Sequence, residues 1–261
     1  MKYIDIGLNL MHKSYNKDRE EVIKNAQNVG VTNAIITGAD IQSSVEAAEY
    51  SEKYPGILYS TAGVHPHDAK TCDENTIKIL EELASKDSVV SLGECGLDYN
   101  RNYSPQNIQR KWFKKQLELA EKLDMPVFLH DRESYPDFSN ILKQFPSVAE
   151  KSVVHCFTGN KNEVEEYLSL GCYIGVTGWI CDERRGDELR EAVKCIPPQK
   201  LMIETDGPFL IPRDLKPKPK KHRNEPKYLP HILERIASEM DLDSDKLSKQ
   251  VYKNTKSFFN I

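Results

Sequence analysis

Eight short runs of apolar and β-branched residues recur along the chain, separated by longer and more polar segments. Several of the runs are almost continuously apolar, as expected of strands that are covered on both faces. We therefore expect eight strands, at Tyr3–Leu8, Asn33–Thr37, Leu58–Val64, Val89–Glu94, Val127–His130, Ser152–Phe157, Tyr173–Thr177 and Leu201–Asp206.

Segments with apolar residues at helical spacing lie between most of these runs. Between residues 105 and 123, for example, Trp112, Phe113, Leu117 and Ala120 recur at the spacing of one helix face. The predicted helices are Asp18–Val29, Asp73–Ala84, Pro105–Leu123, Asn162–Leu170, Arg185–Cys195, Tyr228–Met240 and Ser244–Phe258.

The alternation of strands and helices predicts a parallel sheet of the α/β class. Eight strand–helix units in 261 residues fit a (β/α)8 barrel, or TIM barrel. An open, doubly wound sheet is the second hypothesis, but no glycine fingerprint follows the first strand. We expect residues 1–261 to form a single domain, because no linker or low-complexity tract divides them.

The composition is ordinary for a globular protein, with 39% hydrophobic and 29% charged residues. No apolar run is long enough to cross a bilayer, and the N-terminus lacks the apolar region of a signal peptide. The six cysteines show no CxxC spacing, so we expect reduced thiols and a cytoplasmic protein. We also expect a monomer that does not bind membranes.

Four of the predicted strands end in residue types that bind metal ions, namely Glu94, His130, His155 and Asp206. In a barrel the carboxyl ends of the strands form the functional face, so these side chains are expected to converge. A buried carboxylate is costly unless a cation or hydrogen bonds compensate for it. One such residue would be an ordinary polar strand end, but four together predict a site for a hard or borderline divalent metal.

Two histidines follow the third predicted strand, in the sequence Gly63-Val64-His65-Pro66-His67. His65 and His67 could be metal ligands, proton carriers or hydrogen-bonded loop residues. Cys95 and Cys156 directly follow candidate ligands, but neighbouring residues of a strand point to opposite faces. We therefore expect both thiols to point away from the metal.

Basic residues near the predicted strand ends are candidates for phosphate contacts. Arg132 lies two residues beyond a candidate ligand, and a basic segment spans residues 213–223, with Arg213 and Lys218 among its charges. The net charge of −4 argues against a nonspecific coat on nucleic acid, but it allows a local basic patch. A solvated loop is the alternative interpretation of the segment.

Taken together, several motifs resemble the TatD family of metal-dependent nucleases, within the amidohydrolase superfamily, and bacterial members in particular. The resemblance extends over nearly the whole chain. The matching segments are Gly63-Val64-His65-Pro66-His67, Gly93-Glu94-Cys95-Gly96-Leu97-Asp98, Pro126-Val127-Phe128-Leu129-His130, His155-Cys156-Phe157-Thr158-Gly159, Thr177-Gly178-Trp179, Glu204-Thr205-Asp206 and Arg223-Asn224-Glu225-Pro226.

The resemblance implies a divalent-cation-dependent hydrolase of phosphodiester bonds in DNA. We expect a 3′-to-5′ exonuclease on single-stranded DNA, with RNA as a further substrate, and Mg²⁺ as the cation, with Mn²⁺ or Zn²⁺ as alternatives. Much of the family carries Asp-x-His-x-His on strand one, a ligand pair for a second metal. Here the stretch is Asp5-Ile6-Gly7-Leu8-Asn9, which lacks both histidines and predicts one firm metal site.

In this interpretation Glu94, His130 and His155 hold the metal. Asp206 is either a fourth ligand or the group that orients and deprotonates the attacking water. His65 holds the phosphate or assists the leaving oxygen. Substrate contacts are assigned to His67, Arg132, Arg213 and Lys218.

Two other functions remain open from the sequence. One is hydrolysis of a small amide, lactone or phosphoester, since the fold alone does not determine the substrate. A bridging carbamylated lysine would favour it, but no lysine ends a predicted strand. The other is a barrel that binds nucleotides without turnover.

Overall fold

The computed structural model describes residues 1–219 and 222–261. Its strands are β1 (Tyr3–Leu8), β2 (Val31–Ile36), β3 (Leu58–Ala62), β4 (Val89–Asp98), β5 (Val127–Arg132), β6 (Ser152–Val154), β7 (Tyr173–Val176) and β8 (Leu201–Ile203). Its α-helices are α1 (Arg19–Asn28), α2 (Ile41–Ser51), α3 (Thr76–Ala84), α4 (Gln106–Leu123), α5 (Tyr135–Leu142), α6 (Pro146–Ala149), α7 (Lys161–Ser169), α8 (Asp187–Val193), α9 (Leu229–Glu239) and α10 (Ser244–Phe259). Five short 3₁₀ helices are η1 (Lys13–Tyr15), η2 (Pro66–Thr71), η3 (Gly178–Cys181), η4 (Pro198–Lys200) and η5 (Pro226–Tyr228).

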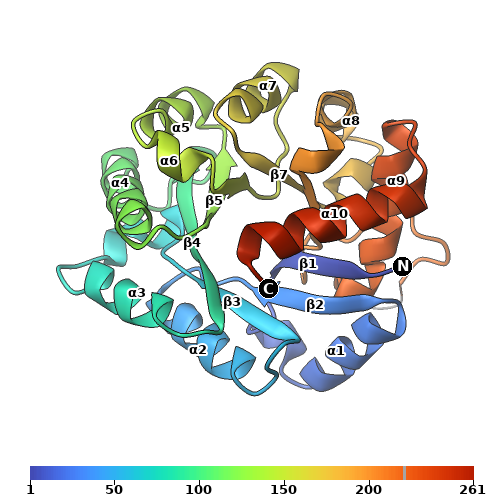
Figure 1. The fold of residues 1–261 in the computed structure, drawn as a ribbon, viewed down its shortest axis with the longest axis horizontal. Helices are drawn as coiled ribbons and strands as arrows, with labels where there is room; N and C mark the ends of the chain where they lie inside the picture. Colours follow the sequence, from blue (N-terminus) through green and yellow to red (C-terminus); the bar gives the residue numbers. More distant parts are fainter. Residues whose placement is uncertain (220–221) are drawn as a thin grey trace. The chain divides into compact units, whose positions relative to one another are not determined.

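The strand order in the sheet follows the sequence from β1 to β8, and the described pairings are parallel. Helices alternate with the strands along the chain (Figure 1). This order is that of the (β/α)8 barrel, whereas a doubly wound sheet reverses its strand order at a switch point. The fold class expected from the sequence is therefore confirmed.

Contacts divide the chain into two compact units, each built from separated stretches. The first unit is Met1–Ile36, Cys156–Glu165 and Ile174–Ile261, and the second is Thr37–His155 and Glu166–Tyr173. The expectation of one domain over residues 1–261 stays a prediction. Among the described residues, no helix has both the length and the apolar character needed to cross a bilayer.

In the first unit, β1 is buried along its whole length and pairs with β2, while β7 pairs with β8. Helix α10 packs against β1 and β8. The amide of Asn254 on this helix donates to the carbonyls of Pro198 and Leu201, at 2.7 and 2.8 Å. These two hydrogen bonds fix the helix to the start of β8.

In the second unit, β4 lies between β3 and β5, and β5 also pairs with β6. Helices α2, α3 and α4 pack beside β3 and β4 (Figure 1). The buried side chain of Gln116 on α4 accepts from the Val64 amide at 2.8 Å and donates to the Val64 carbonyl at 3.1 Å. This pair of hydrogen bonds holds the backbone directly before His65.

Three helices of the second unit, α2, α5 and the four-residue α6, were not predicted from the sequence. The buried face of α2 consists of Ser44, Ala47, Ala48 and Ser51, so it lacks the large apolar residues that reveal helical periodicity. Helix α5 has a proline at its start and spans only eight residues. The hydrophobic pattern alone therefore did not reveal these helices.

Strand ends also differ from the predicted bounds. β4 continues to Asp98, while β6 and β8 stop at Val154 and Ile203. Cys156 and Asp206 adopt positive φ angles of 45° and 52°, which turn the chain out of the extended conformation just after these strands. His155 and Asp206 therefore follow their strands rather than ending them.

The contact between α2 and the end of β3 allows a test of stability. The fully buried Ser44 hydroxyl accepts from the Gly63 amide at 3.1 Å and donates to the Gly63 carbonyl at 3.2 Å. Ser44→Ala removes both contacts, so we expect the free energy of unfolding in urea to fall by about 1–3 kcal/mol. Glu49→Ala, at an exposed position of the same helix, should change it by less than about 0.5 kcal/mol. Equal effects of the two substitutions would contradict this role of Ser44.

Candidate metal centre and active site

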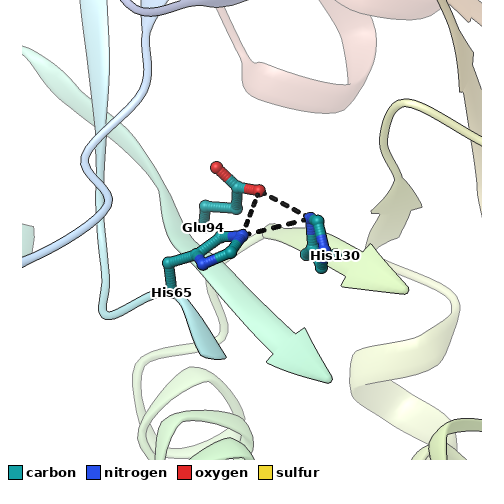
Figure 2. A group of neighbouring side chains, drawn as sticks. All are labelled: His65, Glu94 and His130. Atoms are coloured by element: carbon teal, nitrogen blue, oxygen red, sulfur yellow. Dashed lines mark hydrogen bonds and ion pairs between the residues drawn. The ribbon is translucent and has the colours of Figure 1, made fainter. Parts of the chain in front are cut away.

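The carboxylate of Glu94 is surrounded by three histidine rings. Glu94 is only 7% exposed and lies on β4. Its Oε1 atom is 2.7 Å from His155 Nε2, 2.9 Å from His130 Nδ1 and 3.3 Å from His65 Nε2. Figure 2 shows His65, Glu94 and His130 pointing toward one another. Within the second unit, the structure thus brings these four predicted site residues together.

The charges of this cluster follow from burial and hydrogen bonding. Burial alone would raise the pKa of Glu94, but His155 and His65 hold it well below its usual range. Burial lowers the pKa of His65 to about 4. Burial also opposes a charge on His130, but hydrogen bonds to Asp98 and Glu94 raise its pKa. The centre therefore contains an anionic carboxylate beside a neutral imidazole at neutral pH.

The His65 ring is oriented by the backbone that follows it. Its Nδ1 accepts a hydrogen bond from the backbone amide of His67 at 3.1 Å. A neutral ring that accepts at Nδ1 carries its hydrogen on Nε2. His65 therefore presents an N–H donor, and not a lone pair, toward Glu94 and His130.

The donor set suits a divalent cation. Two ring nitrogens contact one carboxylate oxygen, namely His130 Nδ1 and His155 Nε2 with Glu94 Oε1. Such nitrogen and oxygen donors are the usual ligands of catalytic zinc and related ions. His130 Nε2 is buried and lies 3.4 Å from Asp98 Oδ2. A hydrogen on this nitrogen leaves the Nδ1 lone pair free for a metal, so the ring fits a ligand role.

Asp98 is a functional candidate that was missed in the sequence analysis. Its Oδ2 lies 2.8 Å from His67 Nε2, and its Oδ1 accepts from the Arg101 amide at 2.7 Å. Burial would raise the pKa of Asp98, but its bonds to His130 and His67 lower it strongly. Asp98 stands four residues after Glu94 on the same strand, and residues at even spacing share a strand face. This spacing is the feature of the sequence from which Asp98 could have been predicted as a site residue.

Asp206 belongs to the first unit, where Asn9 and Gly7 hold it. The Asn9 amide donates to Asp206 Oδ1 at 2.8 Å, and the Asp206 backbone N–H donates to the Gly7 carbonyl at 2.8 Å. The stretch that lacks the histidine pair therefore positions this carboxylate. Its role in metal binding or catalysis stays a prediction.

Asp5, in the middle of β1, is the other important carboxylate that was missed. It is fully buried, and it accepts from the Thr205 amide at 2.9 Å and from the Thr205 hydroxyl. Burial raises the pKa of Asp5 to about 7, against the lowering effect of these hydrogen bonds. Asp5 thus ties β1 to the segment that follows β8, directly before Asp206.

The predicted phosphate contacts have varied surroundings. Arg132 ends β5 with a partly exposed side chain, and Lys218 is exposed. Arg213 is paired with Glu183 at 3.2 Å and lies 3.7 Å from Asp182, so its charge is largely compensated. Lys220 and Lys221 of the basic segment lie outside the described residues.

Arg223 was counted with the basic segment, but it serves the fold. Its guanidinium is paired with Asp18 at 2.8 Å and with Glu225 at 2.7 Å, and the residue is buried. The expectation that Arg223 contributes to an exposed basic strip was wrong, because both of its neighbouring carboxylates compensate its charge.

The two cysteines beside candidate ligands differ in their surroundings. Cys95 is fully buried, and Cys156 Sγ lies 3.8 Å from the Thr177 hydroxyl.

The raised pKa of Asp5 predicts a pH effect on stability. Unfolded Asp5 ionises from about pH 4, whereas folded Asp5 stays protonated up to about pH 7. The stabilising contribution is thus complete below about pH 4 and is lost as the pH rises through 7, at up to about 1.4 kcal/mol per pH unit. We expect wild type to lose stability relative to Asp5→Asn over this range. Urea unfolding of both proteins at several pH values tests this, and a difference that does not change with pH would contradict it.

Comparison with known proteins adds to this geometry. The family profile described as TatD-related DNase matches residues 4–260. A protein of Pectobacterium atrosepticum named 3′-5′ ssDNA/RNA exonuclease TatD is 46% identical over 257 residues, covering 98% of this chain and 99% of the relative. A protein of Rahnella sp. with the same name is also 46% identical and covers 98% of both chains.

Solved structures agree with this assignment. A TatD homologue from Escherichia coli K12 superimposes with a TM-score of 0.90 at 24% identity, covering 99% of this chain and 98% of the other. A TatD family hydrolase from Entamoeba histolytica gives a TM-score of 0.88 at 29% identity, with coverage of 99% and 98%. The sequence match over nearly the whole length, together with the shared barrel, shows that this chain belongs to the family of TatD-related DNases.

Proposed function

We propose that this chain is a divalent-metal-dependent exonuclease that removes nucleotides from the 3′ end of single-stranded DNA, and also of RNA. The observation that carries the proposal is the single oxygen of Glu94 that meets three imidazole nitrogens at 2.7–3.3 Å. The names of the relatives from Pectobacterium atrosepticum and Rahnella support the substrate and the polarity. The family supports hydrolysis as the reaction.

We assign metal binding to Glu94 Oε1, His130 Nδ1 and His155 Nε2. When bound, a divalent cation offsets the charge of a phosphate oxygen and makes a water molecule more acidic. The phosphate substrate favours Mg²⁺, and the two imidazoles also accept Mn²⁺ or Zn²⁺. Asp98 orients the His130 ring, since a carboxylate beside the outer ring nitrogen is the usual partner of a metal-binding histidine.

The remaining side chains act on the substrate and on protons. His65 donates its Nε2–H to a phosphate oxygen, because its Nδ1 is occupied by the His67 amide. Asp206, oriented by the Asn9 amide, accepts the proton of the attacking water or serves as a fourth ligand. His67 and Arg132 contact neighbouring phosphates. We further propose that the protein works as a monomer in the cytoplasm.

We assign binding of the nucleic-acid strand to the exposed lysines after β8. Lys216 and Lys218 are exposed, whereas Arg213 must leave Glu183 before it can bind a phosphate. We therefore assign the main phosphate contacts of this segment to the lysines and a secondary contact to Arg213. A small neutral substrate would have no use for such charges.

The metal assignment predicts the effect of removing a ligand. Loss of a residue that merely orients a metal ligand costs about 10–100-fold in activity or metal affinity. We therefore expect Glu94→Gln or His155→Ala to lower nuclease activity by more than about a hundredfold. The measurement is release of mononucleotides from end-labelled single-stranded DNA, with Mg²⁺, Mn²⁺ or Zn²⁺ and with a chelator.

Glu118→Gln, at an exposed position on α4, is the matched control and should retain full activity. Metal-independent release of nucleotides, or full activity of Glu94→Gln, would contradict the assignment. Metal binding without any release would instead favour a barrel that only binds nucleotides.

The lysine assignment predicts a change in salt dependence. Each phosphate neutralised on a single strand contributes a slope of roughly −0.7 in log affinity against log salt concentration. The double variant Lys216→Ala/Lys218→Ala should therefore reduce the slope by up to about 1.4 on long single strands. Cleavage of a small chromogenic phosphodiester should change much less, because that substrate reaches only the metal centre.

The control is Lys24→Ala/Lys249→Ala, which removes the same charge at exposed positions on other helices. Equal salt-dependence slopes for the two double variants would contradict the lysine assignment and favour the interpretation of the segment as a solvated loop. Equal losses on the long and the small substrate would mean that the lysines support the active site itself.

A further inference from the structure

A second group of metal-binding side chains lies within the first unit, in the part of the chain that the structure describes. Cys181, Asp214 and His231 each offer one ligand atom, and these atoms all lie within 4.8 Å of one another. His231 Nε2 is 2.6 Å from Asp214 Oδ1. A thiol, a carboxylate and an imidazole meet here without any role in the nuclease mechanism.

The three residues come from three separate segments. Cys181 ends η3, Asp214 lies in the connection that follows β8, and His231 lies in the first turns of α9. Cys181 is 3% exposed, whereas the side chains of Asp214 and His231 are 32% and 33% exposed. The group thus has a buried sulfur at its base and remains open to solvent on the other side, as entry of an ion requires.

Positive charge near the group is balanced by other carboxylates. Arg235 Nη1 lies 3.9 Å from Asp214 Oδ2, but its Nη2 is paired with Glu239 at 2.5 Å. Arg190 is paired with Asp187. Each arginine therefore has a counter-ion other than Asp214.

We propose that Cys181, Asp214 and His231 form a binding site for a borderline divalent ion, of which Zn²⁺ is the best match. Zinc accepts thiolate, imidazole and carboxylate together, whereas Mg²⁺ prefers oxygen ligands and does not take a thiolate. On binding, the thiol releases one proton to solvent, and the thiolate and the ion form a bond. A water molecule fills the fourth position.

The state of the free thiol agrees with this role and not with that of a nucleophile. Burial and the neighbouring Asp214 carboxylate raise the pKa of Cys181, so the thiol keeps its proton in the absence of an ion. A reactive cysteine needs a lowered pKa. A metal ion is the ligand that removes such a proton at neutral pH, and its affinity must therefore rise with pH.

Binding would join η3, the connection after β8 and α9 at one point. A ligand that binds only the folded chain stabilises it, so zinc should raise the melting temperature. This function is separate from the nuclease activity, because it uses no residue of the Glu94 cluster and adds a thiol, which that cluster lacks.

Cobalt titration tests the proposal, since Co²⁺ bound to a thiolate gives a charge-transfer band in the near ultraviolet. We expect the metal-free protein to develop this band as Co²⁺ is added, and Zn²⁺ to abolish it. Cys181→Ser should lack the band, and His231→Gln should bind Co²⁺ at least about tenfold more weakly. Cys195→Ser, a partly buried cysteine outside the group, should behave as wild type.

The thermal shift gives a second measurement. Zinc should raise the melting temperature of Glu94→Gln, whose nuclease centre has lost a ligand, but much less that of Glu94→Gln/Cys181→Ser and Glu94→Gln/His231→Gln. No thiolate band in wild type, or a band that persists in Cys181→Ser, would overturn the proposal. Because neither measurement uses nuclease activity, failure of the proposed function would leave this test intact.

Discussion

The second unit depends on the burial of one charged carboxylate. Glu94 loses nearly all of its contact with water, and an ionised carboxylate without compensation is unstable in such a place. Its Oε1 atom meets nitrogens from three rings at 2.7–3.3 Å, which keeps the pKa low. Because this one oxygen contacts a nitrogen of each of three rings, negative charge is concentrated at the point that the three rings face. That arrangement favours a cation.

The outer edges of the rings are fixed by a second layer of contacts. His65 Nδ1 accepts from the backbone of His67, and His130 Nε2 faces Asp98 at 3.4 Å. Gln116 holds the backbone just before His65 through both the N–H and the C=O of Val64. These contacts orient the rings, so that His65 presents an N–H, whereas a neutral His130 with its hydrogen on Nε2 has its lone pair on Nδ1. Two histidines in one cluster thereby receive different chemical roles.

The positions of the strands could be predicted because burial on both faces produces apolar runs, although several strands end elsewhere than predicted. Tyr3–Leu8 has the same bounds in the sequence prediction and in the structure. Helix α2 could not be found this way, since its buried face consists of small serines and alanines. Asp98 was missed because its role depends on the ring of His130, which reaches it from another strand. The tautomer of His65 depends on a backbone amide two residues away, which no composition reveals.

The stretch Gly7-Leu8-Asn9 bears on the number of metals. An asparagine could offer its oxygen to an ion, but the Asn9 amide nitrogen faces Asp206 Oδ1 at 2.8 Å. A carboxylate that accepts this hydrogen is already oriented without a metal, and Gly7 contributes only its backbone carbonyl. Asp5 beneath them is held protonated up to about pH 7 by burial, so it adds little negative charge. Strand one therefore positions Asp206 through hydrogen bonds, and one firmly held metal at Glu94, His130 and His155 stays a prediction.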